Sequence, residues 1–482
     1  MLPLGANILS HRMDNPFFDL LKQCFGHQMT ENQHSAATDI ISFLSSVSDD
    51  VLFLLCGYAG TGKTTLISAL VKALRQYNHQ VILLAPTGRA AKVIAHYAEQ
   101  PAYTIHKKIY RLKKFGDAES AFGLLDNKHV DTLFVVDEAS MISNSSDGNG
   151  FGSGRLLDDL IEYIYSGSGC RLLLIGDNAQ LPPVGSTLSP ALDHSYLRGF
   201  GLHLYDATLT EVVRQSNTSG ILYNATLLRQ TLSQQTTSLF PTIHCNQYAD
   251  ITLVSGNDLI DELSSSYDRH GVEETMVITR SNKRANIFNQ GIRNQILWRE
   301  GPIETGDRLM ITKNNYFWGS EIEQLGFIAN GEIAQVMRIR EDYEIYGLHF
   351  ITALLLLPDH DLEIEAKIIL EALTAEAPGL TRTQSDHLFR SVEEDYIDIP
   401  RKGDRYKAIK ADPHFNALVV KYAYAITCHK AQGGQWESIF LDIGFLNEDM
   451  LGEEFYRWLY TAITRSTSRL YFINLPQEMI EP

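Results

Sequence analysis

The sequence predicts an α/β protein whose strands form parallel sheets. Four continuous apolar runs have the length of buried strands, and they occupy residues 51–56, 81–85, 133–136 and 172–175. The first run leads through a glycine-rich turn into a helical pattern with a leucine every fourth residue. Apolar strands that alternate with helices are typical of parallel sheets covered on both faces. A second set of strands begins near Thr275, and core patterning returns at 417–428.

Length and composition indicate a soluble globular protein of about two to four domains. The chain has 482 residues, of which 44% are hydrophobic and 21% charged. No apolar run approaches the roughly 18 residues of a membrane span, so we expect no membrane association. The N-terminus has no basic residue ahead of its apolar patch, so we expect no signal peptide. Five scattered cysteines without a C-x-x-C pair argue against zinc and disulfides and favour a cytoplasmic location.

The charge of the chain is unevenly distributed. The formal net charge is −17, which by itself opposes a polyanionic partner. Residues 341–400, however, contain 14 acidic and 3 basic residues, whereas residues 101–114 contain five basic and no acidic residues. The net charge therefore does not exclude nucleic acid.

The glycine-rich turn after the first strand predicts a phosphate-binding loop. Its residues are Gly57, Tyr58, Ala59, Gly60, Thr61, Gly62, Lys63, Thr64 and Thr65. Backbone N–H groups of such a loop, together with the helix N-terminus, surround the phosphates of a nucleoside triphosphate. Lys63 is then expected to reach the β- and γ-phosphates, and the Thr64 hydroxyl to help hold Mg²⁺.

Two adjacent carboxylates end the third strand. In phosphate-loop ATPases the first, here Asp137, helps to hold Mg²⁺. Glu138 is placed to orient and deprotonate the attacking water. Gln180, after the fourth strand, is positioned to sense the γ-phosphate, and Arg214 is either an arginine finger or a surface arginine.

Several further positions have two interpretations. Gln33 is either part of a capping box with Thr30 or a reader of the adenine edge. Thr87 is either a helix cap or a contact to a nucleic-acid backbone. The basic strip at 107–114, with interleaved aromatic residues, is either a solvated face or a binding surface for single-stranded nucleic acid. Residues 144–154 are rich in Ser, Gly and Asn and predict a mobile surface loop. Residues 364–373 predict a helix within the acidic segment.

Six motifs in order resemble the superfamily 1 helicases of the RecD-like branch, which includes the Dda helicase. They are GYAGTGKTT, APTGRAAKV, VVDEASM, LIGDNAQLPPVG, AYAITCHKAQGGQW and YTAITRS. The resemblance extends from Gln33 to Arg469. It implies two RecA-like domains, at 1–270 and at 271–336 with 414–482. It also implies a small strand-separating hairpin at about 107–130, with Phe115 or Phe122 as its wedge, and an SH3-like insertion at 337–413.

The resemblance assigns roles to individual residues. ATP would be bound by Gln33, Gly57, Gly60, Thr61, Gly62, Lys63, Thr64, Thr65 and Gln435, where Gln435 stands in place of a glutamate common in relatives. Mg²⁺ would be held by Thr64 and Asp137. The catalytic groups would be Lys63, Glu138, Gln180, Arg214 and Arg465, and DNA would be contacted by Thr87, His106, Lys107, Lys108, Thr427 and His429.

The resemblance implies an ATP hydrolase that moves along single-stranded DNA, characteristically from 5′ to 3′, and separates duplexes at junctions. It would act as a monomer in its basic motor unit, with repair or replication proteins as possible partners. Alternatives are a phosphate-loop ATPase that acts on protein, a nucleic-acid-binding subunit without turnover, and a motor subunit of a larger recombination or repair complex. Movement along RNA instead of DNA is a further alternative.

Overall fold

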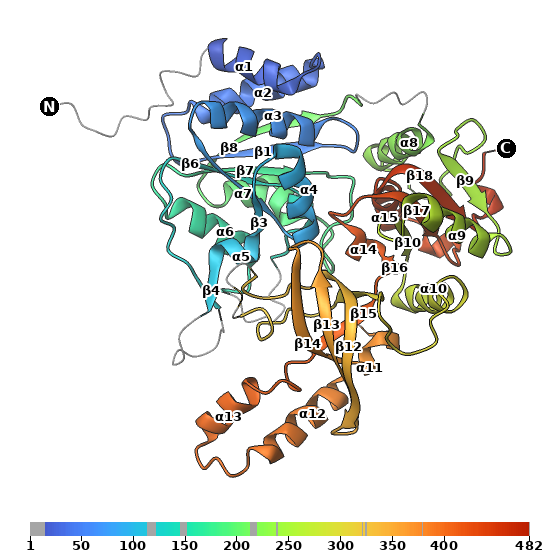
Figure 1. Ribbon diagram of the computed structural model, residues 1–482. Helices are drawn as coiled ribbons and strands as arrows, with labels where there is room; N and C mark the ends of the chain where they lie inside the picture. Colours follow the sequence, from blue (N-terminus) through green and yellow to red (C-terminus); the bar gives the residue numbers. More distant parts are fainter. Residues whose placement is uncertain are drawn as a thin grey trace.

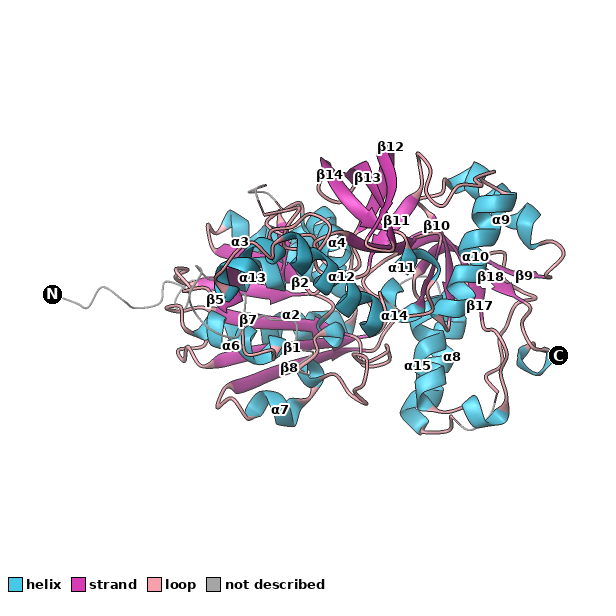
Figure 2. Ribbon diagram, turned by 90° about the horizontal axis from the view of Figure 1, so that it is seen from below, coloured by secondary structure: helices cyan, strands magenta, loops and turns pink. Residues whose placement is uncertain are grey.

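The computed structural model describes residues 15–112, 122–144, 152–212, 219–237, 240–320, 322, 325–377 and 379–481. Figure 1 shows two α/β units beside each other, with a β-barrel at their junction. Figure 2 shows the two sheets following one another across the molecule. Among the described residues, no helix is long and apolar enough to cross a membrane.

The first unit is built on a six-stranded parallel sheet in the order β3-β2-β6-β7-β1-β8. Its strands are β1 (Val51–Gly57), β2 (Gln80–Ala85), β3 (Ala102–Thr104), β6 (Thr132–Val136), β7 (Arg171–Gly176) and β8 (His203–Leu209). All seven residues of β1 are buried, as expected for a strand covered on both faces.

Successive side chains of this sheet enter two separate cores. Helices α1 (Asn15–Phe25), α2 (Glu31–Leu44), α3 (Lys63–Gln76) and α4 (Gly88–Ala98) cover one face. Helices α5 (Ile105–Ile109), α6 (Leu156–Tyr165) and α7 (His194–Arg198) cover the other. Phe53 and Leu55 pack with the first group, and Leu52 and Leu54 with the second. The doubly covered parallel sheet predicted from the apolar runs is confirmed.

The second unit contains a five-stranded parallel sheet in the order β16-β10-β17-β18-β9. Its strands are β9 (Ile251–Val254), β10 (Thr275–Thr279), β16 (Ala425–Thr427), β17 (Trp436–Asp442) and β18 (Ser466–Ile473). Its helices are α8 (Gly220–Gln234), α9 (Leu259–His270), α10 (Asn282–Gln295), α14 (Cys428–Ala431) and α15 (Glu453–Ile463). Because β9 pairs with β18, this unit begins before residue 271, the predicted boundary.

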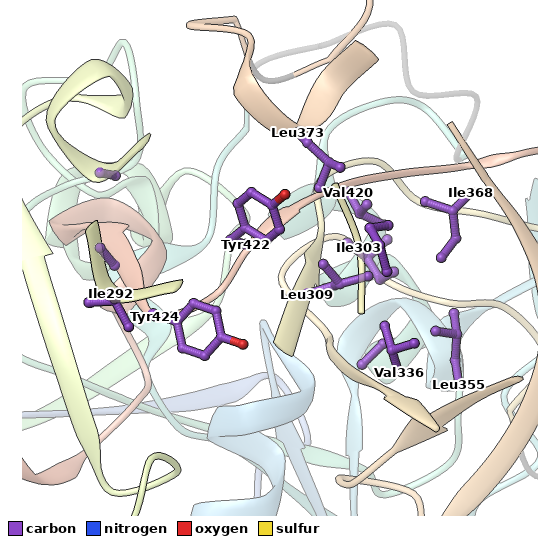
Figure 3. Packing of buried hydrophobic residues seen from close by; sticks show 14 of the residues in the cluster. Ile292, Ile303, Leu309, Val336, Leu355, Ile368, Leu373, Val420, Tyr422 and Tyr424 are labelled. Atoms are coloured by element: carbon purple, nitrogen blue, oxygen red, sulfur yellow. The ribbon is translucent and has the colours of Figure 1, made fainter. Parts of the chain in front are cut away.

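The barrel is closed by β11 (Arg308–Ile311), β12 (Ile333–Ile345), β13 (Leu348–Leu357), β14 (Leu362–Ile369) and β15 (Leu418–Tyr422). It therefore extends beyond the predicted insertion at 337–413, because β11 pairs with both β12 and β15. The helix expected at 364–373 is instead β14 followed by α11 (Glu371–Thr374), since the buried residues of β14 alternate along the strand. The core of the barrel includes Leu309, Val336 and Val420 (Figure 3).

A helical hairpin that was not predicted from the sequence projects from the barrel. It consists of α12 (Arg382–Asp395) and α13 (Lys402–Lys410) and points away from both sheets in Figure 1. Leu388, Val392 and Ile409 attach it to the barrel. Short 3₁₀ turns occur at Ala139–Met141, Pro190–Leu192, Glu448–Met450 and Gln477–Met479.

A two-stranded antiparallel ribbon lies within the predicted hairpin at 107–130. It consists of β4 (Tyr110–Leu112) and β5 (Phe122–Leu124). The connection at 113–121 lies outside the described residues, and so does Phe115, one of the two expected wedges. Most of the surface loop expected at 144–154 lies outside them as well.

Buried charges join the barrel to the second unit. Asp307, which is fully buried, accepts hydrogen bonds from Arg293 of α10 at 2.9 and 3.0 Å and from Arg299 at 2.8 Å. It also accepts one from the hydroxyl of Tyr424 at 2.9 Å. A buried carboxylate is stable only when it is paired and hydrogen-bonded in this way. The network fixes the base of the barrel against the end of α10.

Candidate active site

A cavity of about 290 Å³ lies between the two α/β units. The first unit contributes most of the predicted nucleotide residues, namely Gln33, Gly60, Gly62, Lys63, Thr64, Thr65, Asp137, Glu138 and Gln180. The second unit contributes Gln435 and Arg465. Residues far apart in the sequence are thus brought to one place. Arg214, also predicted here, lies outside the described residues.

The phosphate-binding loop joins the end of β1 to the start of α3. Gly60 and Gly62 have φ values of +78° and +82°, a backbone conformation that side chains disfavour. The Lys63 ammonium donates to the carbonyls of Gly57 at 2.6 Å and Tyr58 at 2.9 Å. It is therefore held at the mouth of the loop, where a triphosphate would be met.

Two predicted ligand residues, Gly57 and Thr61, do not line the cavity. A Cβ atom on Gly57 would stand 3.0 Å from both Leu209 Cβ and Lys63 Cγ, so this glycine permits close packing behind the loop. Thr61 is fully buried, and its hydroxyl donates to the Tyr58 carbonyl at 2.8 Å. Both residues shape the loop from within.

Gln33 lines the cavity, and both functional atoms of its amide are bound by protein. The amide oxygen accepts from the Thr30 N–H at 3.0 Å, which completes the capping box of α2. The amide nitrogen donates to the Thr61 carbonyl at 2.9 Å. The capping interpretation is confirmed, and Gln33 also supports the phosphate-binding loop, which spacing alone did not indicate.

The two carboxylates lie at the end of β6. Burial and the adjacent Glu138 raise the pKa of the Asp137 carboxyl. An Asp137 oxygen accepts from the Glu138 N–H at 2.8 Å. Glu138 has φ +52°, an uncommon conformation for a residue other than glycine, and such strain is concentrated at functional sites. It directs the Glu138 carboxylate into the same cavity as Lys63.

Arg465 reaches this cavity from the second unit. It follows α15 and is 3% exposed, and its guanidinium donates to the carbonyls of Thr461 at 3.1 Å and Gly434 at 3.3 Å. One guanidinium nitrogen lies 3.6 Å from a Glu138 carboxylate oxygen. An ion pair thus crosses the boundary between the units inside the cavity.

Gln180 provides a further polar group. Its side chain is 6% exposed and lines the cavity, and its amide oxygen has no hydrogen-bond partner within the part of the chain that the structure describes. A buried amide oxygen without a partner is costly, so it is suited to meet a ligand or an ordered water.

Comparison with known proteins gives two matches to family models. A model described as "AAA domain" matches residues 28–239, and one described as "UvrD-like helicase C-terminal domain" matches residues 422–473. The ATP-dependent RecD2 DNA helicase of Deinococcus radiodurans is 32% identical over 147 residues, which is 30% of this chain and 18% of that protein. The ATP-dependent DNA helicase dda of Enterobacteria phage T4 is 30% identical over 196 residues, 39% of this chain and 40% of that protein. These similarities support a superfamily 1 helicase of the RecD-like branch.

The matched regions span less than half the length of either relative. Among solved structures, a Pif1 helicase from Bacteroides in complex with ADP-AlF3 and single-stranded DNA is 18% identical, with 95% of each chain covered and a TM-score of 0.45.

The residues that the sequence assigned to DNA differ in burial and in hydrogen bonding. The Thr87 hydroxyl accepts from the Ala90 N–H at 3.2 Å, so its capping role is confirmed. Thr427 precedes α14 and makes no side-chain cap. Burial lowers the pKa of His106 to about 4 and also lowers the pKa of His429, so both rings are neutral at pH 7.

Lys107 and Lys108 are partly buried, which lowers the pKa of each ammonium. Lys108 lies over the ring of Tyr103 at 5.6 Å. Lys107 lines a second cavity, of about 270 Å³, between α4, β3 and the barrel. Lys113 and Lys114, which continue the basic strip, lie outside the described residues.

Several further residues line the nucleotide cavity that were not predicted from the sequence. They are Phe25, His27, Tyr97, Ser466 and Thr467. Ser466 and Thr467 follow Arg465 directly, so their proximity to that motif was an available signal. Phe25, His27 and Tyr97 have no spacing that could have indicated them.

Proposed function

We propose that this chain hydrolyses ATP between its two α/β units and uses the cycle to move along single-stranded DNA from 5′ to 3′. The observation that carries the proposal is the approach of Arg465 to Glu138 at 3.6 Å, within the cavity that the phosphate-binding loop lines. A catalytic group from each unit is required, so turnover depends on how the units are arranged.

The chemistry follows from the positions of the side chains. Lys63 and the loop N–H groups bind the β- and γ-phosphates. Glu138 accepts a proton from water as the water oxygen attacks the γ-phosphorus, and the bond to the ADP oxygen breaks. Arg465 stabilises the negative charge that develops on the γ-phosphoryl oxygens.

A magnesium ion fits the oxygen donors of this cavity. Thr64 and Asp137 both line it, and Mg²⁺ is commonly held by one or two protein oxygens together with phosphates and water. When bound, the ion neutralises charge on the phosphates. Burial favours the protonated form of Asp137, and an adjacent cation favours the carboxylate that would hold it.

Movement follows from the shared site. ATP that contacts Lys63 on one unit and Arg465 on the other favours the closed arrangement by the contacts made only there. Loss of the γ-phosphate removes those contacts. If the surfaces near Thr87 and His106 and near Thr427 and His429 grip the strand alternately, each cycle advances it.

The expected substrate is a single strand next to a duplex junction, with the β4–β5 ribbon as the separating element. Lys107 and Lys108 supply positive charge close to this ribbon. All five cysteines are free thiols, which supports a reducing, cytoplasmic environment. A monomer is the basic motor unit, and repair or replication proteins are its expected partners.

The testing experiment is the ATPase rate with and without single-stranded DNA, followed by unwinding of 5′-tailed and 3′-tailed duplexes. Strong stimulation, with unwinding from the 5′ tail alone, is expected. Unwinding from the 3′ tail alone would show that the protein moves from 3′ to 5′. Stimulation by RNA alone would show that it moves along RNA and not along DNA. No stimulation by either nucleic acid would contradict the proposal and favour a protein substrate.

A further inference from the structure

A tyrosine of the second unit is bonded to the phosphate-binding loop of the first. The hydroxyl of Tyr460, on α15, accepts a hydrogen bond from the Ala59 N–H at 2.8 Å. The same hydroxyl donates to a carboxylate oxygen of Asp177 at 2.7 Å. Tyr460 is 1% exposed, so neither bond competes with bulk water. Both geometries are those of well-formed hydrogen bonds.

The two partners of this hydroxyl have separate roles in the first unit. Ala59 lies in the phosphate-binding loop and lines the nucleotide cavity. Asp177 follows β7 and also lines the cavity, and its other carboxylate oxygen accepts from the Ala179 N–H at 2.9 Å. Gln180 follows directly. One hydroxyl therefore joins the loop to the segment that carries Gln180.

Neighbouring contacts hold the second unit against that segment. The Thr461 hydroxyl accepts from the Leu181 N–H at 2.9 Å, and the Gln432 amide donates to the Leu181 carbonyl at 2.7 Å. These bonds reach the 177–181 segment, whereas the Tyr460 bond continues to the loop itself. Burial raises the pKa of Tyr460 well above its ordinary value, so the hydroxyl keeps the proton that it donates to Asp177.

We propose that Tyr460 is a positioning residue that makes the conformation of the phosphate-binding loop depend on the docking of the second unit. When the units separate, the Ala59 N–H loses its acceptor and Asp177 loses its donor in the same event. The loop and the Gln180 segment are then released together. This inference rests on the proposed function, because it assigns to the DNA-driven cycle a route by which the second unit reaches the loop.

The competing explanation is that Tyr460 only fills the core of the second unit, in which its ring is packed. Tyr460→Phe keeps the ring and removes the hydroxyl, so it separates the two explanations. Tyr456→Phe is the matched control, because Tyr456 lies one turn earlier on α15 and is similarly buried, at 3% exposed.

With Tyr460→Phe we expect kcat for ATP in the presence of single-stranded DNA to fall about tenfold, as for the loss of a hydrogen bond that orients a catalytic group. The KM for ATP should change less than twofold, because Lys63 and the rest of the loop are retained. Tm should stay within about 4 °C of that of Tyr456→Phe, in line with the loss of one hydrogen bond. Tyr456→Phe should keep the wild-type kcat.

A double-mutant cycle that combines Tyr460→Phe with Asp177→Ala tests whether the Tyr460 hydroxyl acts through its hydrogen bond to Asp177. If the hydroxyl and the carboxylate act as one unit, the double variant should lose no more kcat than the worse single variant. Independent, additive losses would overturn the proposal. So would a wild-type kcat in Tyr460→Phe, or an equal loss in Tyr456→Phe.

Failure of the proposed function would be seen separately. If the wild-type protein is not stimulated by DNA, the helicase proposal fails, and the ratio of DNA-free kcat between Tyr460→Phe and wild type still decides the role of the tyrosine. A ratio near one overturns that role, and a ratio well below one, with KM preserved, supports it.

Discussion

The guanidinium of Arg89 lies over the indole ring of Trp436, 3.9 Å from the ring centroid. Arg89 belongs to α4 of the first unit, and Trp436 begins β17 of the second. Arg89 also donates to the Gln435 carbonyl at 2.9 Å. A Cβ atom on Gly434 would stand 2.5 Å from the indole and 2.9 Å from Arg89 Nε, so the close approach requires glycine there. This contact joins the units next to the nucleotide cavity.

Replacing Arg89 tests the importance of this contact. Arg89→Lys removes the planar guanidinium that stacks on Trp436 and donates to Gln435, and a lysine ammonium cannot stack flat on the indole while it donates to that carbonyl. We expect DNA-stimulated ATPase to fall about three- to tenfold, the range for a desolvated cation–π contact. Arg75→Lys, on the exposed face of α3, is the control. An unchanged rate would show that the contact does not stabilise the active arrangement.

Glu138→Gln should abolish turnover and leave the fold intact. Glutamine keeps the size of the side chain and cannot accept the proton of the attacking water, so we expect steady-state ATPase to fall by about 10²–10⁴-fold. Lys63→Ala should be comparably inactive because it removes the phosphate-binding ammonium. Circular dichroism and Tm check folding, and Glu162→Gln on the exposed face of α6 is the control. Substantial turnover in Glu138→Gln would assign the general base to another residue.

Arg465→Ala should separate nucleotide binding from hydrolysis. Nucleotide binding is expected to persist because the phosphate-binding loop is untouched. Hydrolysis should fall by about 10³-fold, the lower range for an arginine finger. Fluorescent-nucleotide titration and ATPase assays measure the two effects. Arg469→Ala, on β18 four residues after Arg465, is the control, and normal hydrolysis in Arg465→Ala would refute the catalytic assignment.

The basic strip can be tested through salt dependence. The double variant Lys107→Ala and Lys108→Ala removes two candidate phosphate contacts. The slope of log K against log salt for single-stranded DNA should become shallower by about 1.4, since each neutralised phosphate contributes roughly 0.7. A second double variant, Lys22→Ala and Lys72→Ala, changes the net charge equally on α1 and α3. The same slope in both variants would make the strip an ordinary solvated face.

A stability effect of pH follows from His106. Burial lowers its folded pKa to about 4, below the ordinary 6.5, so folding favours the neutral ring. The contribution is complete above pH 6.5 and is lost as the pH falls towards 4. Between pH 8 and pH 5, His106 should cost about 1–2 kcal/mol of the free energy of unfolding, a range that allows for its partial exposure. Urea unfolding should show a smaller loss in His106→Gln, whereas exposed His387→Gln should match wild type.

Local chemistry was the most predictable part of this molecule. The phosphate-binding loop and the Asp137–Glu138 pair depend on consecutive residues, so spacing was enough to predict them. The partners of short strands were not predictable. Ile251–Val254 has only four residues, and its place beside β18 is set by pairing with a strand more than 200 residues later. A strand pattern likewise does not say whether β11 and β15 join a sheet or a barrel.

Hydrogen bonds between side chains and distant elements were also not predictable from the sequence. Gln33 has the spacing of a capping box, and its bond to the Thr61 carbonyl depends on how α2 packs beside the loop. Tyr460 stands in a motif whose arginine was recognised, and its hydroxyl had no partner until the two units were placed together. Such contacts come from the assembly of elements and leave no local pattern.

The order of strands in the second sheet has a consequence for the biogenesis of the protein. All strands of the first sheet lie between residues 51 and 209, whereas β10 must pair with β16 and β17, which follow the whole barrel. Domains generally fold as units during synthesis, from the N-terminus onward, and long loops delay closure. The phosphate-binding half of the cavity therefore matures on the ribosome well before Arg465 emerges. We therefore expect the phosphate-binding loop to form before Arg465 has been synthesised, so that nucleotide binding would precede hydrolysis during synthesis.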